Sequence, residues 1–153
     1  MKIVSQMVEV HVIRQVNSQI EFLLLKRAPG EIYENLWQMV SGRIEPEEKA
    51  YETALREVKE ETGFTAQRIW AAPNVNSFYS AHNDEMNLIP VFAVLVNPEA
   101  KVVISDEHSD YKWLTKEECS IMLAWEGQRK SVDIIYDYFL NFRGFLDLVE
   151  IFV

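Results

Sequence analysis

Apolar and polar residues alternate near the start of the chain in a pattern that predicts two β-strands. Residues 7–13 place three valines on one side of an extended chain, because successive side chains of a strand point to opposite faces: Val8, Val10 and Val12. A second, strongly apolar stretch covers residues 20–26, and Asn17-Ser18 between the two stretches is typical of a turn. We therefore expect a β-hairpin over residues 7–26.

The remaining pattern predicts short strands interspersed with helices. The expected strands are residues 36–40, 65–76, 87–95, 101–104 and 111–114, and residues 28–35 are expected to form a loop. The expected helices are residues 47–62, 115–123 and 128–142. Pro46 stands where a first helical turn tolerates proline, and Gly63 is a typical C-terminal cap. This order predicts one α/β domain over residues 1–153, a mixed sheet with helices on both faces.

The composition narrows the class of protein. The 153 residues are 48% hydrophobic and 25% charged, which is typical of one globular domain. A net charge of −9 argues against a nucleic-acid binder or an anionic-membrane binder, since both need basic surfaces. The single cysteine, Cys119, excludes an intrachain disulfide and a cysteine-based zinc site. We find no signal peptide and no apolar run of membrane-spanning length, so we expect a cytoplasmic protein that binds no membrane.

One predicted helix carries an unusual cluster of carboxylates. Glu57, Glu60 and Glu61 are spaced three or four apart, so they project from one side of the helix. Like charges at this spacing repel by about 0.2–0.5 kcal/mol per pair, and Arg56 can reach Glu60 to offset part of that cost. The pattern fits either a solvated, salt-bridged helix face or a site for a hard divalent cation such as Mg²⁺, which prefers oxygen ligands.

The residues around this cluster favour the cation site. Gly42 is followed after five residues by Glu48, and after seven more by the run Arg56-Glu57-Val58-Lys59-Glu60-Glu61-Thr62-Gly63-Phe64. This stretch resembles the Nudix box at every defined position. Many members have a second glycine before the first, where this chain has Ser41, but that position lies outside the strict motif.

The resemblance to Nudix hydrolases implies a fold and a set of site residues. The family fold is an α/β/α sandwich around a mixed β-sheet, and the family hydrolyses phosphoanhydride bonds of nucleoside diphosphate-linked substrates with a divalent metal, here Mg²⁺ or alternatively Mn²⁺. By resemblance, Glu57, Glu60 and Glu61 hold the metal and Arg56 orients them, while Gly42 contributes backbone at the metal site. Glu48 braces the loop of the box.

Two further stretches resemble parts of Nudix enzymes. Arg27, at the end of the second strand, corresponds to an arginine that often touches phosphate, although a solvated strand end is the alternative. Glu107 precedes a Tyr-x-Trp-Leu strand, and the resemblance implies an extra metal ligand or a general base there. His108 is interpreted as a structural histidine or a phosphate contact.

The sequence gives weaker indications for several residues outside these motifs. Gln128 and Arg129 are expected to cap or approach the site, whereas Phe78 and Tyr79 are expected in the core rather than against a base or pterin. The apolar tail over residues 144–153 is expected to pack against the domain or against a second subunit of a homodimer.

We expect a metal-dependent pyrophosphohydrolase that cleaves a nucleoside triphosphate, such as dATP, or dihydroneopterin triphosphate to the monophosphate and pyrophosphate. The stretch around Trp37 resembles such enzymes and lacks the proline-rich segment of dinucleoside tetraphosphate hydrolases, which are the first alternative. The second alternative is a catalytically silent nucleotide-binding regulatory module. The intact, self-repelling glutamate set argues against it.

Overall fold

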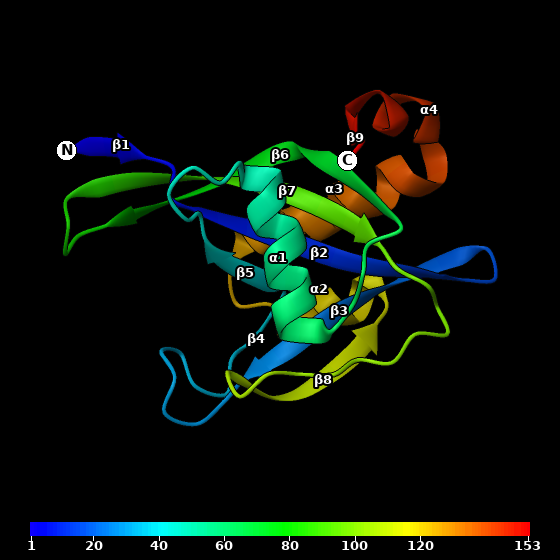
Figure 1. The fold of residues 1–153 in the computed structure, drawn as a ribbon, viewed down its shortest axis with the longest axis horizontal. Coiled ribbons are helices and arrows are strands. Elements are labelled where there is room, and N and C mark those ends of the chain that lie inside the picture. The colour runs from blue at the N-terminus through cyan, green and yellow to red at the C-terminus, as the bar shows by residue number, and fades with distance from the viewer.

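A mixed nine-stranded sheet lies between helices in the computed structural model, which describes residues 1–153 (Figure 1). The strands are β1 (Lys2–Val4), β2 (Met7–Val16), β3 (Gln19–Arg27), β4 (Trp37–Gln38), β5 (Val40–Arg43), β6 (Arg68–Ser80), β7 (Glu85–Leu95), β8 (His108–Leu114) and β9 (Glu150–Ile151). The helices are α1 (Ala50–Thr62), α2 (Lys116–Met122), α3 (Glu126–Asn141), α4 (Arg143–Leu146) and the 3₁₀ turn η1 (Asp147–Val149). None of these helices has the length and apolar character needed to cross a membrane.

Strand β2 is the centre of the sheet and has neighbours on both sides. The path through the sheet runs β4-β3-β2-β7-β6-β9, with β5 also on β2, β8 on β3 and β1 on β7. The β2–β7 and β1–β7 pairs are parallel and the others are antiparallel. Strand β5 pairs with the first residues of β2, and β3 pairs with its last residues, as expected for the 7–26 hairpin.

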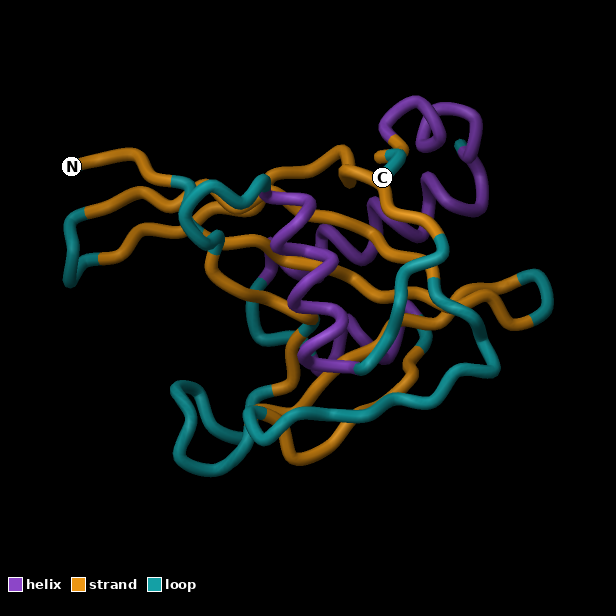
Figure 2. Tube along the Cα trace, in the orientation of Figure 1, coloured by secondary structure: helices purple, strands orange, loops and turns teal.

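Two hydrophobic cores cover the two faces of the sheet. The alternation predicted for β2 is confirmed, because Val8, Val10 and Val12 join Val58 of α1 in one core. The opposite core contains Ile13 and residues of α2 and α3. Figure 2 shows α1 in front of the strands and the longer α3 behind them. The predicted α/β/α sandwich is therefore confirmed.

Helix α1 begins three residues later than the sequence predicts. Glu47 has a φ of 66°, which is incompatible with a right-handed helix, and Lys49 is the N-terminal cap. The backbone N–H of Lys49 donates to a carboxylate oxygen of Glu52 at 2.8 Å, as in a capping box. Gly63 ends the helix with a φ of 77°, and its N–H donates to the carbonyl of Lys59 at 3.0 Å. The predicted glycine cap is confirmed.

The strand predicted at residues 101–104 does not form. This segment pairs with no strand, although its Val103 N–H donates to the carbonyl of Thr62 at 2.9 Å. Val102 and Ile104 pack against the core under α1. The apolar spacing was therefore a burial signal, and these residues cover the C-terminal end of α1 instead of extending the sheet.

The apolar tail packs against its own domain in part. Strand β9 pairs with β6, and Leu146 is fully buried. Arg68 of β6 forms ion pairs with Asp147 and Glu150 of the tail. Other apolar tail residues stay exposed: Phe145, Leu148, Phe152 and Val153.

Candidate active site

Helix α1 presents its three candidate metal ligands at different depths. Glu61 is only 4% exposed, and the Glu57 side chain is 13% exposed. The Glu60 side chain is 58% exposed. The shared helix side predicted from the spacing therefore runs from the protein interior to solvent. Glu57 and Glu61 are the two inner carboxylates, and Glu60 lies at the protein surface.

Strand β5 approaches Glu57 so closely that any side chain at position 42 would displace the Glu57 carboxylate. A Cβ added to Gly42 would lie 2.2 Å from the carboxyl carbon of Glu57, well inside contact distance. The backbone around Gly42 is thereby held against the carboxylate pair. This arrangement agrees with the expected place of Gly42 at the site.

Arg56 connects the loop after β5 to the carboxylates. It binds both oxygens of Glu48, with its Nε at 2.9 Å and its Nη2 at 3.0 Å. Its Nη1 donates to Glu57 at 2.8 Å and to Glu60 at 3.3 Å. A guanidinium held by a bidentate partner has a fixed direction, so Arg56 fixes the position of the Glu57 carboxylate. Glu48 occupies the bracing position predicted for it.

The pKa of Glu48 gives a test of this brace. Hydrogen bonds from Arg56 and then from Thr53 lower the Glu48 pKa from 4.5 to about 2. A carboxylate with a lowered folded-state pKa stabilises the fold above pH 4.5, and that contribution is lost as the pH falls toward 2.

We therefore expect Glu48→Gln to lower the melting temperature at pH 7, with a difference from wild type that shrinks steadily as the pH is lowered to about 2. Circular dichroism melts of both proteins across this range measure the difference. A melting-temperature difference that stays constant with pH would show that the Glu48 charge does not support the fold.

Glu61 is a buried carboxyl with an unfilled hydrogen-bonding position. Burial, together with the charges of Glu57 and Glu107, raises the pKa of Glu61 to about 9. The backbone of Ser41 supplies one hydrogen bond to its carboxylate, but Glu61 Oε2 has no partner. A cation would fill this position and offset the repulsion. As the side chains stand, no three His, Cys, Asp or Glu groups are close enough together to hold a metal ion.

Glu107 and Arg27 come together with the α1 carboxylates. The backbone N–H of Ala28 donates to the Glu107 carbonyl at 2.9 Å, which ties the loop before β8 to the end of β3. Burial is the main cause that raises the pKa values of Glu57 and Glu61, and the Glu107 charge adds a smaller increase to both, whereas the Arg27 charge lowers the Glu61 pKa. The exposed Glu107 carboxylate is therefore near enough to the helix glutamates for its charge to act on them.

Arg27 is directed partly toward its own loop. Its Nε donates to the Ile32 carbonyl at 2.7 Å, and its Nη2 lies 3.4 Å from a carboxylate oxygen of Glu31. These bonds leave other guanidinium N–H groups for a ligand. His108, paired with Arg27 across the strands, is buried without a hydrogen-bond partner, and burial lowers its pKa to about 4. A neutral, buried imidazole fits the structural interpretation.

A cavity of about 480 Å³ lies next to this region and has a floor that sequence reasoning missed. Glu9 of β2 is 3% exposed, and it accepts hydrogen bonds from Asn76 Nδ2 at 2.8 Å and Gln128 Nε2 at 2.9 Å. Burial raises the Glu9 pKa, and the two amide bonds partly counter that effect. The available signal was a single glutamate between the valines of a strongly apolar strand.

The aromatic residues around this cavity correct one expectation. Phe78 lines the cavity and is 46% exposed, and Tyr79 is 51% exposed, so neither belongs to the core. Both lie on the part of β6 that extends with β7 beyond the helices (Figure 1). Gln128 lines the cavity, whereas Arg129 donates to the carbonyls of Leu123 and Ala124.

The cavity and the carboxylates meet at strand β5. Glu9 pairs with Ser41 across the β2–β5 ladder, so both side chains lie on the cavity face. Gly42, the next residue, faces Glu57 on the other side. One residue of backbone thus separates the cavity wall from the candidate metal ligands.

Comparisons with known proteins agree with these features. The family model described as the NUDIX domain matches residues 6–134. The asymmetrical bis(5'-nucleosyl)-tetraphosphatase of Rattus norvegicus is 30% identical over 125 residues, which cover 80% of this chain and 83% of that protein. The nucleoside triphosphatase NudI of Salmonella agona is 27% identical over 108 residues, covering 65% and 77%.

Solved structures show the same fold. The dihydroneopterin triphosphate pyrophosphohydrolase of E. coli superposes with a TM-score of 0.69 at 23% identity, covering 85% of this chain and 93% of that chain. An Ap4A hydrolase binary complex from C. elegans gives a TM-score of 0.70 at 21% identity, covering 94% and 98%.

Proposed function

The chain belongs to the Nudix family as a phosphoanhydride hydrolase, and we propose that it cleaves a nucleoside triphosphate or dihydroneopterin triphosphate to the monophosphate and pyrophosphate. Its partner is then a small nucleotide or pterin substrate.

The observation that carries this proposal is the position of the cavity. Its buried polar floor adjoins β5 on one face, and the α1 carboxylates adjoin β5 on the other. A ligand with its ring in the cavity can pass its phosphate chain around this strand to the carboxylates. This shape suits a molecule with one ring system and one short polyphosphate.

Nudix hydrolases generally use divalent metal ions, and we assign Mg²⁺, or Mn²⁺ in its place, to Glu57, Glu60, Glu61, Glu107 and the backbone of Gly42. The orphaned Glu61 oxygen and the mutual repulsion of these carboxylates fit such an ion. When bound, it would lower the pKa of a water and neutralise negative charge on the phosphates.

Other protein groups position the carboxylates, accept a proton and bind phosphate. Arg56 holds Glu57 in place, and the Ser41 backbone does the same for Glu61. Glu107 is exposed and near the helix glutamates, where its carboxylate serves either as an extra metal ligand or as the base that accepts the proton of an attacking water. The unused N–H groups of Arg27 are placed to bind phosphate oxygens and stabilise the charge of the leaving group.

The reaction products test the proposal. We expect purified enzyme with Mg²⁺ to release pyrophosphate, and no orthophosphate, from nucleoside triphosphates or dihydroneopterin triphosphate. Ion-exchange chromatography separates these products, and enzyme treated with a chelator is the control.

A second candidate is dinucleoside tetraphosphate hydrolysis. It is favoured by the tetraphosphatase relatives, which are 30% to 35% identical to this chain over the matched residues. Release of ATP and AMP from diadenosine tetraphosphate, with no pyrophosphate from any triphosphate, would establish this candidate and reject the first.

A further inference from the structure

The floor of the cavity offers hydrogen-bond acceptors that the protein itself leaves free. Gln128 is 7% exposed, and its Oε1 is buried without a hydrogen-bond partner. Each Glu9 oxygen accepts one amide bond, from Asn76 or from Gln128. An ionised carboxylate has about four acceptor positions, so Glu9 keeps about two for a ligand.

The surrounding residues hold these acceptors in fixed directions. The Asn76 Oδ1 accepts the backbone N–H of Ser77 at 2.9 Å, which turns the Asn76 amide nitrogen toward Glu9. Gly127 leaves room for the Asn76 side chain in this position, since a Cβ at residue 127 would lie 2.0 Å from Asn76 Oδ1. With its own nitrogen bound to Glu9, Gln128 has its oxygen left over. Hydrogen bonds therefore hold the side chains of this floor in one arrangement.

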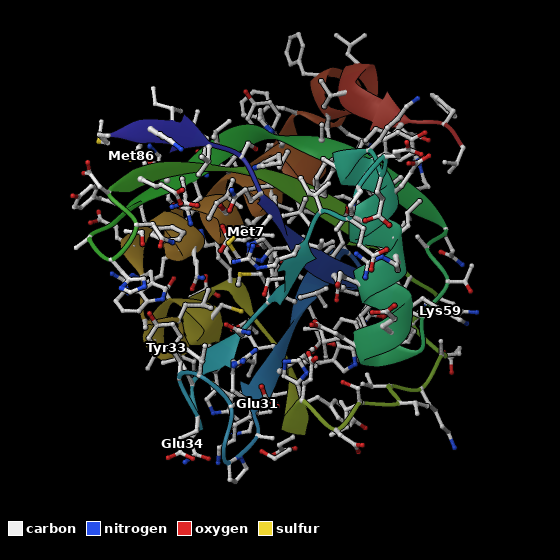
Figure 3. All side chains as sticks on the ribbon, turned by 60° about the vertical axis from the view of Figure 1, so that its left-hand side comes forward. Met7, Glu31, Tyr33, Glu34, Lys59 and Met86 are labelled. Atoms are coloured by element: carbon white, nitrogen blue, oxygen red, sulfur yellow. The ribbon has the colours of Figure 1, made fainter.

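Aromatic side chains stand at the mouth of the same cavity. Tyr33 and Trp125 line it and meet edge-to-face at 6.3 Å and 73°, and both are more than half exposed. Figure 3 shows Tyr33 on the side of the molecule away from Lys59 of α1, and Met7, another lining residue, between them. Exposed aromatic faces next to a polar floor suit a flat heteroaromatic ring.

We propose that Glu9 and Gln128 select a ring whose edge presents an N–H beside an amino group, the edge shared by guanine and pterins. This inference rests on the proposed function and names its substrate class. The ring N–H and the adjacent amino group donate to Glu9 and Gln128 Oε1.

Other bases satisfy this floor less well. Adenine and cytosine present an amino group beside a ring nitrogen acceptor, which would face another acceptor. Uracil and thymine have one N–H between two carbonyl oxygens. A site built from unpaired acceptors discriminates strongly against rings that leave them unpaired, because the buried groups lose their hydrogen bonds to water.

Affinity for monophosphates tests the selection without requiring turnover. Calorimetric titrations of the wild-type protein with GMP, dihydroneopterin monophosphate and AMP, each with Mg²⁺, compare the three edges. We expect GMP or the pterin to bind at least about tenfold more tightly than AMP. Comparing GMP with the pterin shows which of the two rings is the better ligand. Equal affinities, or tighter AMP binding, would overturn the proposal.

Glu9→Gln tests the residue itself. It replaces one acceptor oxygen by an amide donor, so the preferred monophosphate should bind about 10- to 100-fold more weakly, and AMP binding should change less than about threefold. Glu99→Gln, on an exposed turn, makes the same chemical change away from the cavity and should leave all affinities unchanged. Equal losses for all ligands with an intact melting curve would reject Glu9 as a selecting residue. If Glu9→Gln does not fold, Gln128→Met removes the other free acceptor and carries the same expectation.

Turnover separates this inference from the proposed function. Pyrophosphate release from dGTP, dATP and dihydroneopterin triphosphate at equal kcat/KM would leave the proposed function intact and reject the base selection. Selective GMP or pterin binding without hydrolysis of any triphosphate would do the reverse.

Discussion

Glu61→Gln is expected to lower kcat by at least about 10²-fold while the protein stays folded. The loss of one pre-positioned electrostatic group at a reacting phosphate has effects of this size. Glu61 is the most buried of the α1 carboxylates, and its Oε2 is the free ligand position of the site. An amide of the same shape keeps the packing but cannot supply the negative charge.

The fold should tolerate this change for an electrostatic reason. Burial and the charges of Glu57 and Glu107 raise the Glu61 pKa to about 9, so the metal-free carboxyl carries a proton at neutral pH. Replacing one neutral group by another of equal size costs little, and the melting temperature without metal should change by only a few degrees.

Calorimetric titration of Mg²⁺ into Glu61→Gln and wild type, with kcat measured on the same samples, tests this expectation. Glu52→Gln is the matched control, since Glu52 lies on the same helix, is exposed, and caps the helix in a way that glutamine can reproduce. Unchanged Mg²⁺ affinity and kcat in Glu61→Gln would remove Glu61 from the metal site.

The sequence predicted the layers and the charged half of the site because both depend on local spacing. The alternating valines of β2 and the acidic run of α1 each define a face by themselves. Glu57 and Glu61 are neighbours on one helix, so no tertiary information is needed to bring them together.

The cavity could not be predicted in the same way because its parts come from distant segments. Glu9, Asn76 and Gln128 lie in β2, β6 and α3, and only the completed sandwich joins them. The strand predicted at residues 101–104 was wrong for a related reason. Their apolar spacing records burial against α1, and spacing cannot distinguish burial beside a helix from pairing in a sheet.

Substitution of Glu107 tests whether the site has a general base outside α1. The Glu107 backbone is tied to the end of β3 by a hydrogen bond from the Ala28 N–H. Its side chain is exposed, and its charge acts on both Glu57 and Glu61. A carboxylate that is both accessible to water and close to the proposed metal ligands has the features of a general base.

Glu107→Gln is therefore expected to lower kcat by about 10²- to 10⁴-fold, the range for lost acid–base help at a strong site. KM should change little, because the proposed function places ground-state binding on Arg27 and the α1 carboxylates. Asp106→Asn, its exposed neighbour on the same loop, is the matched control and should retain wild-type kcat.

A structural role for Glu107 predicts the opposite pattern, in which the melting temperature falls and the folded fraction turns over normally. Because Glu107 is exposed, its removal should cost little stability, so kcat and melting temperature measured on one preparation separate the two roles. A stable Glu107→Gln protein with wild-type kcat would leave the α1 glutamates as the only carboxylates that act on the attacking water.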